Sequence, residues 1–488
     1  MKLCCIGHSF RYEMEKLCRL FLPFEKIEVT DFILNDNSVA VTKQDNKLIY
    51  ASLKIGDTFF EKSGVLKENY DDRDAERELA ALLFGCFSEM TGYSPKWGIV
   101  TGIRPARLYS AVIKELGSEE AAKEFFSKKF FVNEEKISLC SETHLSEESI
   151  IGLSKNNSFS LYLSVPFCPT RCSYCSFVSH AVEKAEKLIP EYVEYLCKEI
   201  KETAEIARQN NLKLETVYMG GGTPTTLSAE QLEKVLFLVK ESFDFSDVKE
   251  FTVEAGRPDT ITKEKLIALK NCGVNRISIN PQTMSDKVLS VIGRAHTSQQ
   301  TVDAFKLARE VGFDNINMDL IAGLPEDTFE GFKETLNKIL ELDPESVTVH
   351  SLSLKRSSRM NINGDFPEIE VGKIADKMVA YARKTLSGYG IIPYYMYRQS
   401  KTVGNLENVG YAKKGKECLY NVYIMDETHT ILACGASAVT KMREPGGDYI
   451  ERIFNFKYPY EYINRFDELM ERKKGIGEFY SKYPPYLH

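Results

Sequence analysis

An α/β fold built around a parallel β-sheet is predicted by two features of the middle of the chain. Short runs rich in β-branched and other apolar residues alternate with longer runs whose apolar residues recur with the 3.6-residue period of a helix. Strands separated by helices favour parallel pairing through right-handed crossovers. The expected strands are Ser160–Val165, Thr216–Met219, Glu250–Val253, Arg276–Ile279, Asn315–Ile321 and Ser346–Ser351. Their spacing fits an open doubly wound sheet or an incomplete barrel, and does not choose between the two.

The helices between these strands have clear apolar faces. One of them carries Leu232 and Val235 on that face, and its start has the capping-box pattern of Ser228 followed three residues later by Gln231. Another begins near Phe329. In both expected architectures, functional side chains lie on the loops that follow the carboxyl ends of the strands.

Mixed elements are expected on both sides of this region. Before it, Lys26–Phe32 and Leu48–Ile55 alternate like short strands, whereas Ala75–Met90 and Arg107–Leu116 have helical periodicity. After about Pro367 we expect a helical run and then strand-like segments, including Tyr420–Met425 and Thr430–Ala433.

The length of 488 residues indicates two or three domains. A polar stretch, Ser154–Ser158, marks the first expected boundary. We therefore predict an N-terminal α+β domain of unknown role over 1–155, an α/β core over 156–365 and a C-terminal α+β extension over 366–488 that completes the substrate side.

Composition limits the classes of partner and the compartment. The net charge of −7 argues against a general nucleic-acid or membrane-surface binder. No run of about 18 apolar residues occurs, so no membrane span is expected. Charged residues interrupt every apolar run in Met1–Thr30, so no signal peptide is expected and we predict a cytoplasmic protein. In that reducing compartment, a tight group among the 12 cysteines indicates a metal or catalytic site rather than disulfides.

A group of three cysteines directly follows the first expected strand of the core. Cys168, Cys172 and Cys175 have the spacing C-x3-C-x2-C. Thiolates suit zinc, copper(I) and iron–sulfur centres. Structural zinc normally takes four protein ligands, and the nearest histidine, His180, lacks zinc-ribbon spacing. Three thiolates on a [4Fe-4S] cluster would leave one iron open for a small molecule. The alternative interpretations are a zinc site and three packed cysteines without a metal.

A glycine-rich turn follows the second expected strand. It is Gly220-Gly221-Gly222-Thr223, where the glycines allow a ligand to approach the backbone closely. The expected helix after it offers free N–H groups for a carboxylate. Polar side chains also stand at or just beyond the ends of later strands: Glu254, Gln282, Arg294 and Asp319.

These motifs resemble the radical S-adenosylmethionine (radical SAM) superfamily, in particular its oxygen-independent coproporphyrinogen III oxidase-like group. The resemblance covers Phe159–Leu354, and the layout of the whole chain is similar to the coproporphyrinogen dehydrogenase family of the HemZ type. It implies a partial (β/α)6 TIM-like barrel as the core. It also implies that Cys168, Cys172 and Cys175 hold a [4Fe-4S] cluster.

The resemblance implies contacts for S-adenosylmethionine, which we abbreviate SAM, residue by residue. Contacts to the cluster-bound molecule fall on Tyr162, Gly221 and Glu254. Contacts to a second molecule fall on Tyr174, Gly222, Thr223, Gln282, Arg294 and Asp319. One or two molecules are therefore expected. A carboxylate such as Glu254 can hold a ribose diol, and Arg294 can pair with a carboxylate.

The implied activity is that of an oxidoreductase of tetrapyrrole metabolism. An external one-electron donor, such as flavodoxin or ferredoxin, would reduce the cluster, and a 5′-deoxyadenosyl radical would start oxidative decarboxylation of propionates to vinyl groups on coproporphyrinogen III. This sequence has Phe177 where the authentic oxidases have a further cysteine, and its first 158 residues do not resemble their substrate segment. The alternatives in the same group are a haem-binding chaperone and a radical methyltransferase or haem-degrading enzyme.

Overall fold

The computed structural model describes residues 1–23, 25–33, 36–176, 179–353, 368–399 and 401–485. The chain forms two compact units. Unit 1 consists of Met1–His144 and Tyr397–Asn405, and unit 2 of Leu145–Met396 and Leu406–His488. The expected division into three domains stays a prediction, and its second boundary, at 365/366, lies outside the described residues.

Unit 1 is an α+β unit. Its five strands pair in the order β2-β1-β3-β4-β5. They are β1 (Lys2–Ile6), β2 (Glu28–Thr30), β3 (Ser38–Asp45), β4 (Leu48–Ile55) and β5 (Thr58–Val65). The helices are α1 (Arg11–Phe21), α2 (Asp72–Thr91), α3 (Pro105–Leu116) and α4 (Glu119–Phe130). Buried side chains of the sheet and of α1 and α2 form one apolar core, including Leu3, Leu17, Leu53 and Leu83. The expected strand over Lys26–Phe32 shrinks to β2, whereas the other three predicted elements are confirmed.

Unit 2 is built on an eleven-stranded sheet in the order β14-β15-β13-β12-β11-β10-β9-β6-β16-β17-β18. Its parallel part consists of β6 (Ser158–Val165), β9 (Lys213–Gly221), β10 (Glu250–Glu254), β11 (Arg276–Ser278), β12 (Ile316–Ala322) and β13 (Ser346–Ser351). All six expected core strands are therefore confirmed, with ends shifted by up to three residues.

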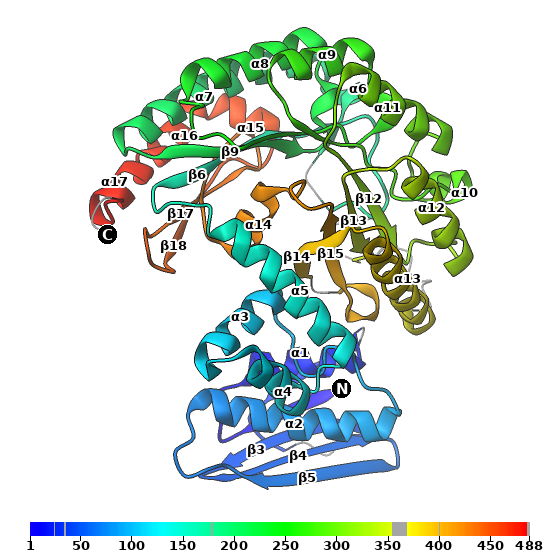
Figure 1. Cartoon of the computed structure of the whole chain (residues 1–488). Coiled ribbons are helices and arrows are strands. Elements are labelled where there is room, and N and C mark those ends of the chain that lie inside the picture. The colour runs from blue at the N-terminus through cyan, green and yellow to red at the C-terminus, as the bar shows by residue number, and fades with distance from the viewer. Residues whose placement is uncertain (24, 34–35, 177–178, 354–367, 400, 486–488) are drawn as a thin grey trace. The chain divides into compact units, whose positions relative to one another are not determined.

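The strand order decides between the two architectures that the sequence left open. Each of these six strands lies beside the next one along the chain, without the reversal of order that defines a doubly wound sheet. The crossover helices consequently fall on one side of the sheet. In Figure 1, α7 (Ile189–Gln209), α8 (Ala229–Ser242), α9 (Lys263–Asn271) and α11 (Ser298–Val311) follow its outer side in that order. This is the arrangement of a partial barrel.

The two ends of the six-stranded array are not joined to each other. Instead, β16 (Thr430–Cys434) pairs parallel with β6, and β15 (Glu407–Ala412) pairs antiparallel with β13. Beyond them lie β17 (Val439–Arg443), β18 (Ile450–Phe454) and β14 (Ile392–Arg398). The C-terminal segment thus extends the barrel sheet at both edges.

The remaining helices complete the chain. They are α5 (Glu134–Ile151), α6 (Val182–Ala185), α10 (Asp286–Val291), α12 (Phe329–Glu341), α13 (Glu368–Gly388), α14 (Leu419–Asp426), α15 (Pro459–Asn464), α16 (Phe466–Lys473) and α17 (Gly475–Lys482). The capping box of Ser228 and Gln231 at the start of α8 is confirmed. None of the helices in the described part of the chain is both long enough and apolar enough to cross a bilayer.

The expected strand over Tyr420–Met425 is wrong, because this segment forms α14. The backbone N–H of Leu419, at the start of the helix, donates to the Glu250 carboxylate at 2.7 Å. Tyr420, Val422 and Tyr423 are buried. Tertiary contacts therefore override the β preference of aromatic and β-branched residues.

Candidate functional site

The cysteine loop, residues 166–176, follows β6 and carries the three cysteines. It begins with β7 (Phe167–Cys168), which pairs parallel with β8 (His180–Ala181). Cys172 is buried, whereas Cys168 and Cys175 are partly exposed. The N–H of Cys175 donates to the carbonyl of Cys172 at 3.2 Å. The loop therefore folds back on itself and brings the last two cysteines into one turn.

The glycine turn that ends β9 is attached directly to this loop. The N–H groups of Gly222 and Thr223 donate to the carbonyls of Val165 and Phe167 at 2.8 and 2.7 Å. Thr223 Oγ1 also donates to Cys168 Sγ at 3.6 Å. Burial raises the pKa of Cys168, and this hydrogen bond opposes that effect. The structure thus brings the two sequence motifs together at one edge of the sheet.

Two glycines in this turn are required by geometry. Gly221 has a φ of +110°, a left-handed conformation that side chains disfavour. A Cβ on Gly222 would lie 2.5 Å from the carbonyl oxygen of Phe167. A side chain at Gly222 would therefore collide with the backbone of the cysteine loop.

Gly222→Ala should displace the cysteine loop, because the clash is with backbone that cannot rotate away. We expect less iron and sulfide per chain after anaerobic reconstitution and a lower melting temperature. Gly388→Ala, at the end of α13 where a Cβ meets nothing within 4 Å, is the matched control and should leave both unchanged. Full iron loading and a wild-type melting temperature in Gly222→Ala would contradict the close approach.

A half-buried carboxylate lies at the end of β10. Glu254 Oε1 accepts a hydrogen bond from Tyr218 OH at 2.6 Å. Tyr162 stacks on Tyr218 with ring centroids 6.3 Å apart, and Tyr420 of α14 stacks on Tyr218 at 4.5 Å. Burial raises the pKa of Glu254 to about 7, with Asp319 contributing in the same direction. A ligand that donates hydrogen bonds to this carboxylate would stabilise its charged form.

The raised pKa predicts how stability depends on pH without ligand. The Glu254 pKa is about 7 in the folded chain and 4.5 in the unfolded chain, so the folded state binds the proton more tightly. This contribution to stability is complete below pH 4.5 and is lost as the pH rises through about 7. Melting temperatures of the wild type and Glu254→Gln, measured across this range, should diverge, with the wild type falling relative to the variant. Parallel curves would contradict the prediction.

Arg294 connects the loops that follow three different strands. Its guanidinium donates to the carbonyl of Asn280 at 2.6 Å and to the carbonyl of Gly256 at 3.2 Å. It also donates to Tyr174 OH on the cysteine loop at 3.1 Å. Arg294 is buried, and its Nε has no hydrogen-bond partner. The predicted pair Tyr174 and Arg294 is therefore in direct contact.

Gln282, on the segment that follows β11, lies beside Asp319 of β12. The N–H of Gln282 donates to the carbonyl of Asp319 at 2.9 Å, and Gln282 has a φ of +69°. Its buried side-chain oxygen has no hydrogen-bond partner. Asp319 Oδ2 lies 3.7 Å from His350 Nε2; burial alone would raise the Asp319 pKa, but His350 and Asn317 lower it overall. A strained residue with an unpaired polar atom is typical of a ligand site.

Sequence reasoning missed several residues of this region. Tyr218 and Tyr420 surround Glu254, and Arg257 lies against the cysteine loop. Tyr218 could have been found, because it lies two residues before Gly220 and therefore on the same face of β9. Tyr420 gave no local signal, since its segment was expected to be a strand. Phe177, the departure from the oxidase motif, lies outside the described residues.

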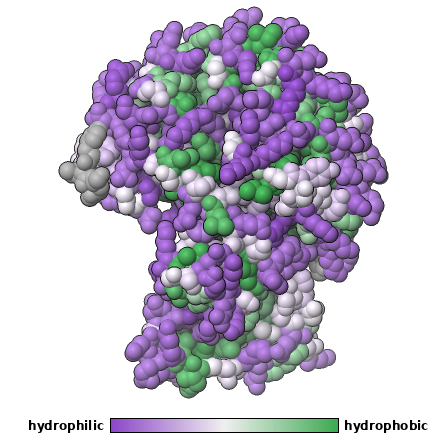
Figure 2. All heavy atoms as spheres, in the orientation of Figure 1, coloured by the Kyte–Doolittle hydropathy of each residue, from purple (hydrophilic) through white to green (hydrophobic). Residues whose placement is uncertain are grey.

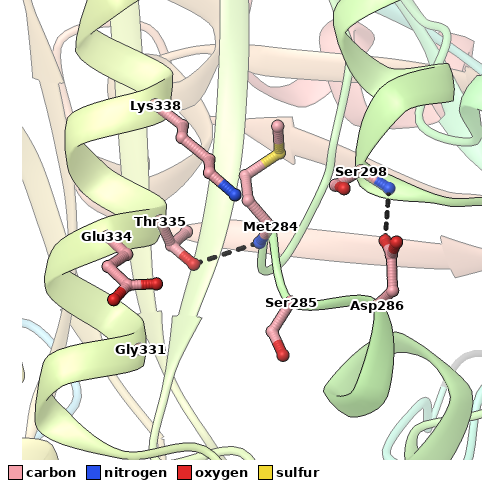
Figure 3. A pocket seen from close by; sticks show the side chains of 8 residues that line it. All are labelled: Met284, Ser285, Asp286, Ser298, Gly331, Glu334, Thr335 and Lys338. Carbon is pink, nitrogen blue, oxygen red and sulfur yellow. Dashed lines mark hydrogen bonds between the residues drawn. The ribbon is translucent and has the colours of Figure 1, made fainter.

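One hollow of about 320 Å³ lies between the start of α10 and α12 (Figure 3). Thr335 Oγ1 accepts from the N–H of Met284 at 3.1 Å, and Asp286 Oδ1 accepts from the N–H of Ser298 at 2.7 Å. None of the predicted site residues lines it. Hydrophilic residues dominate the face of the molecule seen in Figure 2. The candidate site therefore rests on the strand-end groups rather than on this hollow.

The match to a protein-family model defines the class of protein. The model of the radical SAM superfamily matches residues 162–339, which span the cysteine loop and the barrel from β6 to α12. The chain belongs to this superfamily. Membership implies a [4Fe-4S] cluster and SAM.

The more similar relatives define the group within the superfamily. An oxygen-independent coproporphyrinogen-III oxidase-like protein HemZ from Bacillus subtilis (strain 168) is 36% identical over 434 residues, which cover 87% of this chain and 85% of the relative. This chain is a member of that HemZ-like group. A heme chaperone HemW from the same organism is 33% identical over 336 residues, 65% of this chain and 82% of the relative. The solved coproporphyrinogen III oxidase (HemN) of Escherichia coli aligns with a TM-score of 0.49 at 21% identity, over 67% of this chain and 73% of that one.

The residues present fit the implied groups. Among the described residues, no three His, Cys, Asp or Glu side chains are arranged to hold a metal ion. In an iron–sulfur cluster each thiolate binds a different iron, so the three cysteines need not meet at one ion, as zinc would require. The unpaired Arg294 Nε and Gln282 Oε1 fit a polar ligand next to the loop.

Proposed function

We propose that this protein is a radical SAM oxidoreductase that acts on a tetrapyrrole. One observation carries the proposal: the cysteine loop and the glycine turn are joined by backbone hydrogen bonds at the carboxyl ends of parallel barrel strands. In this assignment Cys168, Cys172 and Cys175 are the cluster ligands. When bound and reduced, the cluster supplies the electron that cleaves SAM to methionine and a 5′-deoxyadenosyl radical.

The chain's own residues would bind and orient SAM. Gly221 offers backbone next to the cysteine loop, and Glu254 would accept hydrogen bonds from a ribose diol. Tyr162, stacked in the tyrosine group, would provide an apolar wall beside that carboxylate. In this proposal the co-substrate would bind between the loop and the end of β10, where these residues would orient it for reaction.

A second molecule of SAM is proposed at the contacts centred on Arg294. Its guanidinium would pair with the carboxylate of the ligand, beside the remaining assigned contacts Tyr174, Gly222, Thr223, Gln282 and Asp319. The unpaired Nε of Arg294 is a donor available for that pairing.

The proposed reaction is oxidative decarboxylation of propionate side chains to vinyl groups, as in the conversion of coproporphyrinogen III to protoporphyrinogen IX. The name of the HemZ relative supports this substrate class. We further propose flavodoxin or ferredoxin as the electron donor. A haem carrier is the second candidate, because a relative named as a heme chaperone is 33% identical.

The test is anaerobic turnover with reconstituted protein, reductant, SAM and coproporphyrinogen III, with mass spectrometry of all products. We expect loss of one CO2 per converted propionate, and no product from Cys172→Ala. Tight binding of haem by the wild type, with no conversion of coproporphyrinogen III and no loss of binding in Cys172→Ala, would instead support the carrier.

Arg294→Ala and Glu254→Ala should separate the two co-substrate sites. Glu254→Ala should weaken the cluster-bound SAM by about 10- to 150-fold, because a charged hydrogen bond contributes roughly 1.5–3 kcal/mol. Arg294→Ala should keep the cluster and reduce the SAM bound per chain from two to one. The measurement is equilibrium binding to reconstituted protein. A wild-type ratio of one that Arg294→Ala does not change would refute the second site.

A further inference from the structure

Arg257 is a buried arginine on the loop that follows β10, three residues beyond Glu254. Its guanidinium pairs with the Asp259 carboxylate through two parallel contacts of 3.0 Å, Nε to Oδ1 and Nη2 to Oδ2. This forked geometry fixes the plane of the guanidinium. The remaining nitrogen, Nη1, is thereby aimed away from Asp259.

Nη1 points toward the cysteine loop. It donates to the carbonyl and to Oγ1 of Thr170 at 3.3 and 3.2 Å, and it lies 3.8 Å from Cys172 Sγ. Thr170 stands midway between Cys168 and Cys172 in the sequence. One side chain from the loop after the third core strand therefore contacts both the backbone of the cysteine loop and one of its thiols.

The same stretch of loop is also held by the residues that follow α10. Thr170 Oγ1 donates to the carbonyl of Gly293 at 3.2 Å, and the N–H of Ser173 donates to the carbonyl of Ile292 at 3.0 Å. Those two contacts involve only polar groups without charge. Arg257 adds a positive charge to this stretch of the loop, and it does so where the arginine is only 3% exposed; the buried Arg294 adds a second positive charge at Tyr174.

A cation at this position has a definite electrostatic consequence. Reduction of a cluster adds one negative charge, and hydrogen bonds and charges near the sulfur ligands set its potential. Solvent screens a buried charge little, so its effect is larger than that of a surface arginine. A guanidinium beside a ligand sulfur stabilises the reduced form relative to the oxidised form.

We propose that Arg257 is a positioning residue for the cysteine loop and that its charge raises the reduction potential of the cluster. The proposal rests on the proposed cluster at Cys168, Cys172 and Cys175. Asp259 acts through Arg257, since it orients the guanidinium. A purely structural role would hold the loop without changing the potential.

The test is the midpoint potential of the reconstituted cluster, followed by electron paramagnetic resonance during anaerobic redox titration. Arg257→Gln should show a more negative midpoint potential, and Arg257→Lys an intermediate one, because a lysine keeps the charge but loses the fork. Arg208→Gln is the matched control, since Arg208 is an exposed arginine on α7 that pairs with Glu205, and it should titrate like the wild type.

Iron and sulfide content distinguishes a failure of this inference from a failure of the proposed function. A wild type without a cluster would overturn the proposed function itself. A wild-type potential in fully loaded Arg257→Gln would overturn the inference and leave the function standing. If Arg257→Gln folds but holds no cluster while Arg257→Lys loads fully, the positioning role is supported, and the potential is read from Arg257→Lys, where a value more positive than that of the wild type would overturn the electrostatic role.

Discussion

Replacing Cys172 with alanine should reduce bound iron and sulfide from about four each per chain to near zero. The same result is expected for Cys168→Ala and Cys175→Ala, because a cluster held by three thiolates cannot lose one and remain stable. The measurement is iron and sulfide content, with the electron paramagnetic resonance spectrum, after anaerobic reconstitution.

The matched control is Cys197→Ala. Cys197 is a buried cysteine on α7, outside the cysteine loop, and its replacement should leave iron and sulfide unchanged. Zinc without sulfide in protein purified without oxygen would contradict the cluster and favour the zinc alternative. Equal iron loss in all four variants would show that the effect is not specific to the loop.

Lys473→Met should produce a large loss of stability in unit 2. Lys473 Nζ lies 2.7 Å from Glu199 Oε1, and both side chains have no exposed surface. Burial alone would lower the Lys473 pKa, but Cys434 and Glu199 raise it overall, so the lysine stays charged. Removing one partner of a buried ion pair leaves the other unpaired and typically costs about 3–5 kcal/mol.

The loss of stability should be large because Glu199 also holds several other parts of unit 2 through hydrogen bonds. It also accepts hydrogen bonds from the N–H of Gly435 at 2.7 Å, from Tyr462 OH at 2.6 Å and from Asn455 at 2.8 Å. Thermal unfolding of Lys473→Met and of the control Lys474→Met should be compared. Lys474 is 67% exposed beside Glu471, and a surface pair of this kind contributes only about 0–1 kcal/mol. Equal melting temperatures for the two variants would contradict the account.

The core strands could be predicted from the sequence because burial on both faces leaves a strong local pattern. Ser346–Ser351 was expected and found with the same ends, and the capping box of Ser228 and Gln231 fixed the start of α8. The choice between barrel and open sheet needed strand order, which local periodicity does not contain. Tyr420 was misplaced because contacts from distant residues, such as the Glu250 carboxylate, decide the helix there.

The candidate site was predictable to the extent that motifs stand at strand ends. Cys168 and Thr223 were expected in one site, and they are in contact. Tyr174 and Arg294 are 120 residues apart and also meet. Arg257 was missed because its role depends on how Asp259 orients it toward Cys172, and spacing along the chain does not reveal such a contact.

The most direct test of the central claim is formation of 5′-deoxyadenosine. Anaerobically reconstituted protein should be mixed with SAM and a strong one-electron reductant, and the nucleoside products measured by mass spectrometry. The wild type should release 5′-deoxyadenosine and methionine in equal amounts, and Cys172→Ala should release neither. A fully loaded wild type that yields no 5′-deoxyadenosine with any reductant would contradict the radical SAM oxidoreductase and favour the haem carrier.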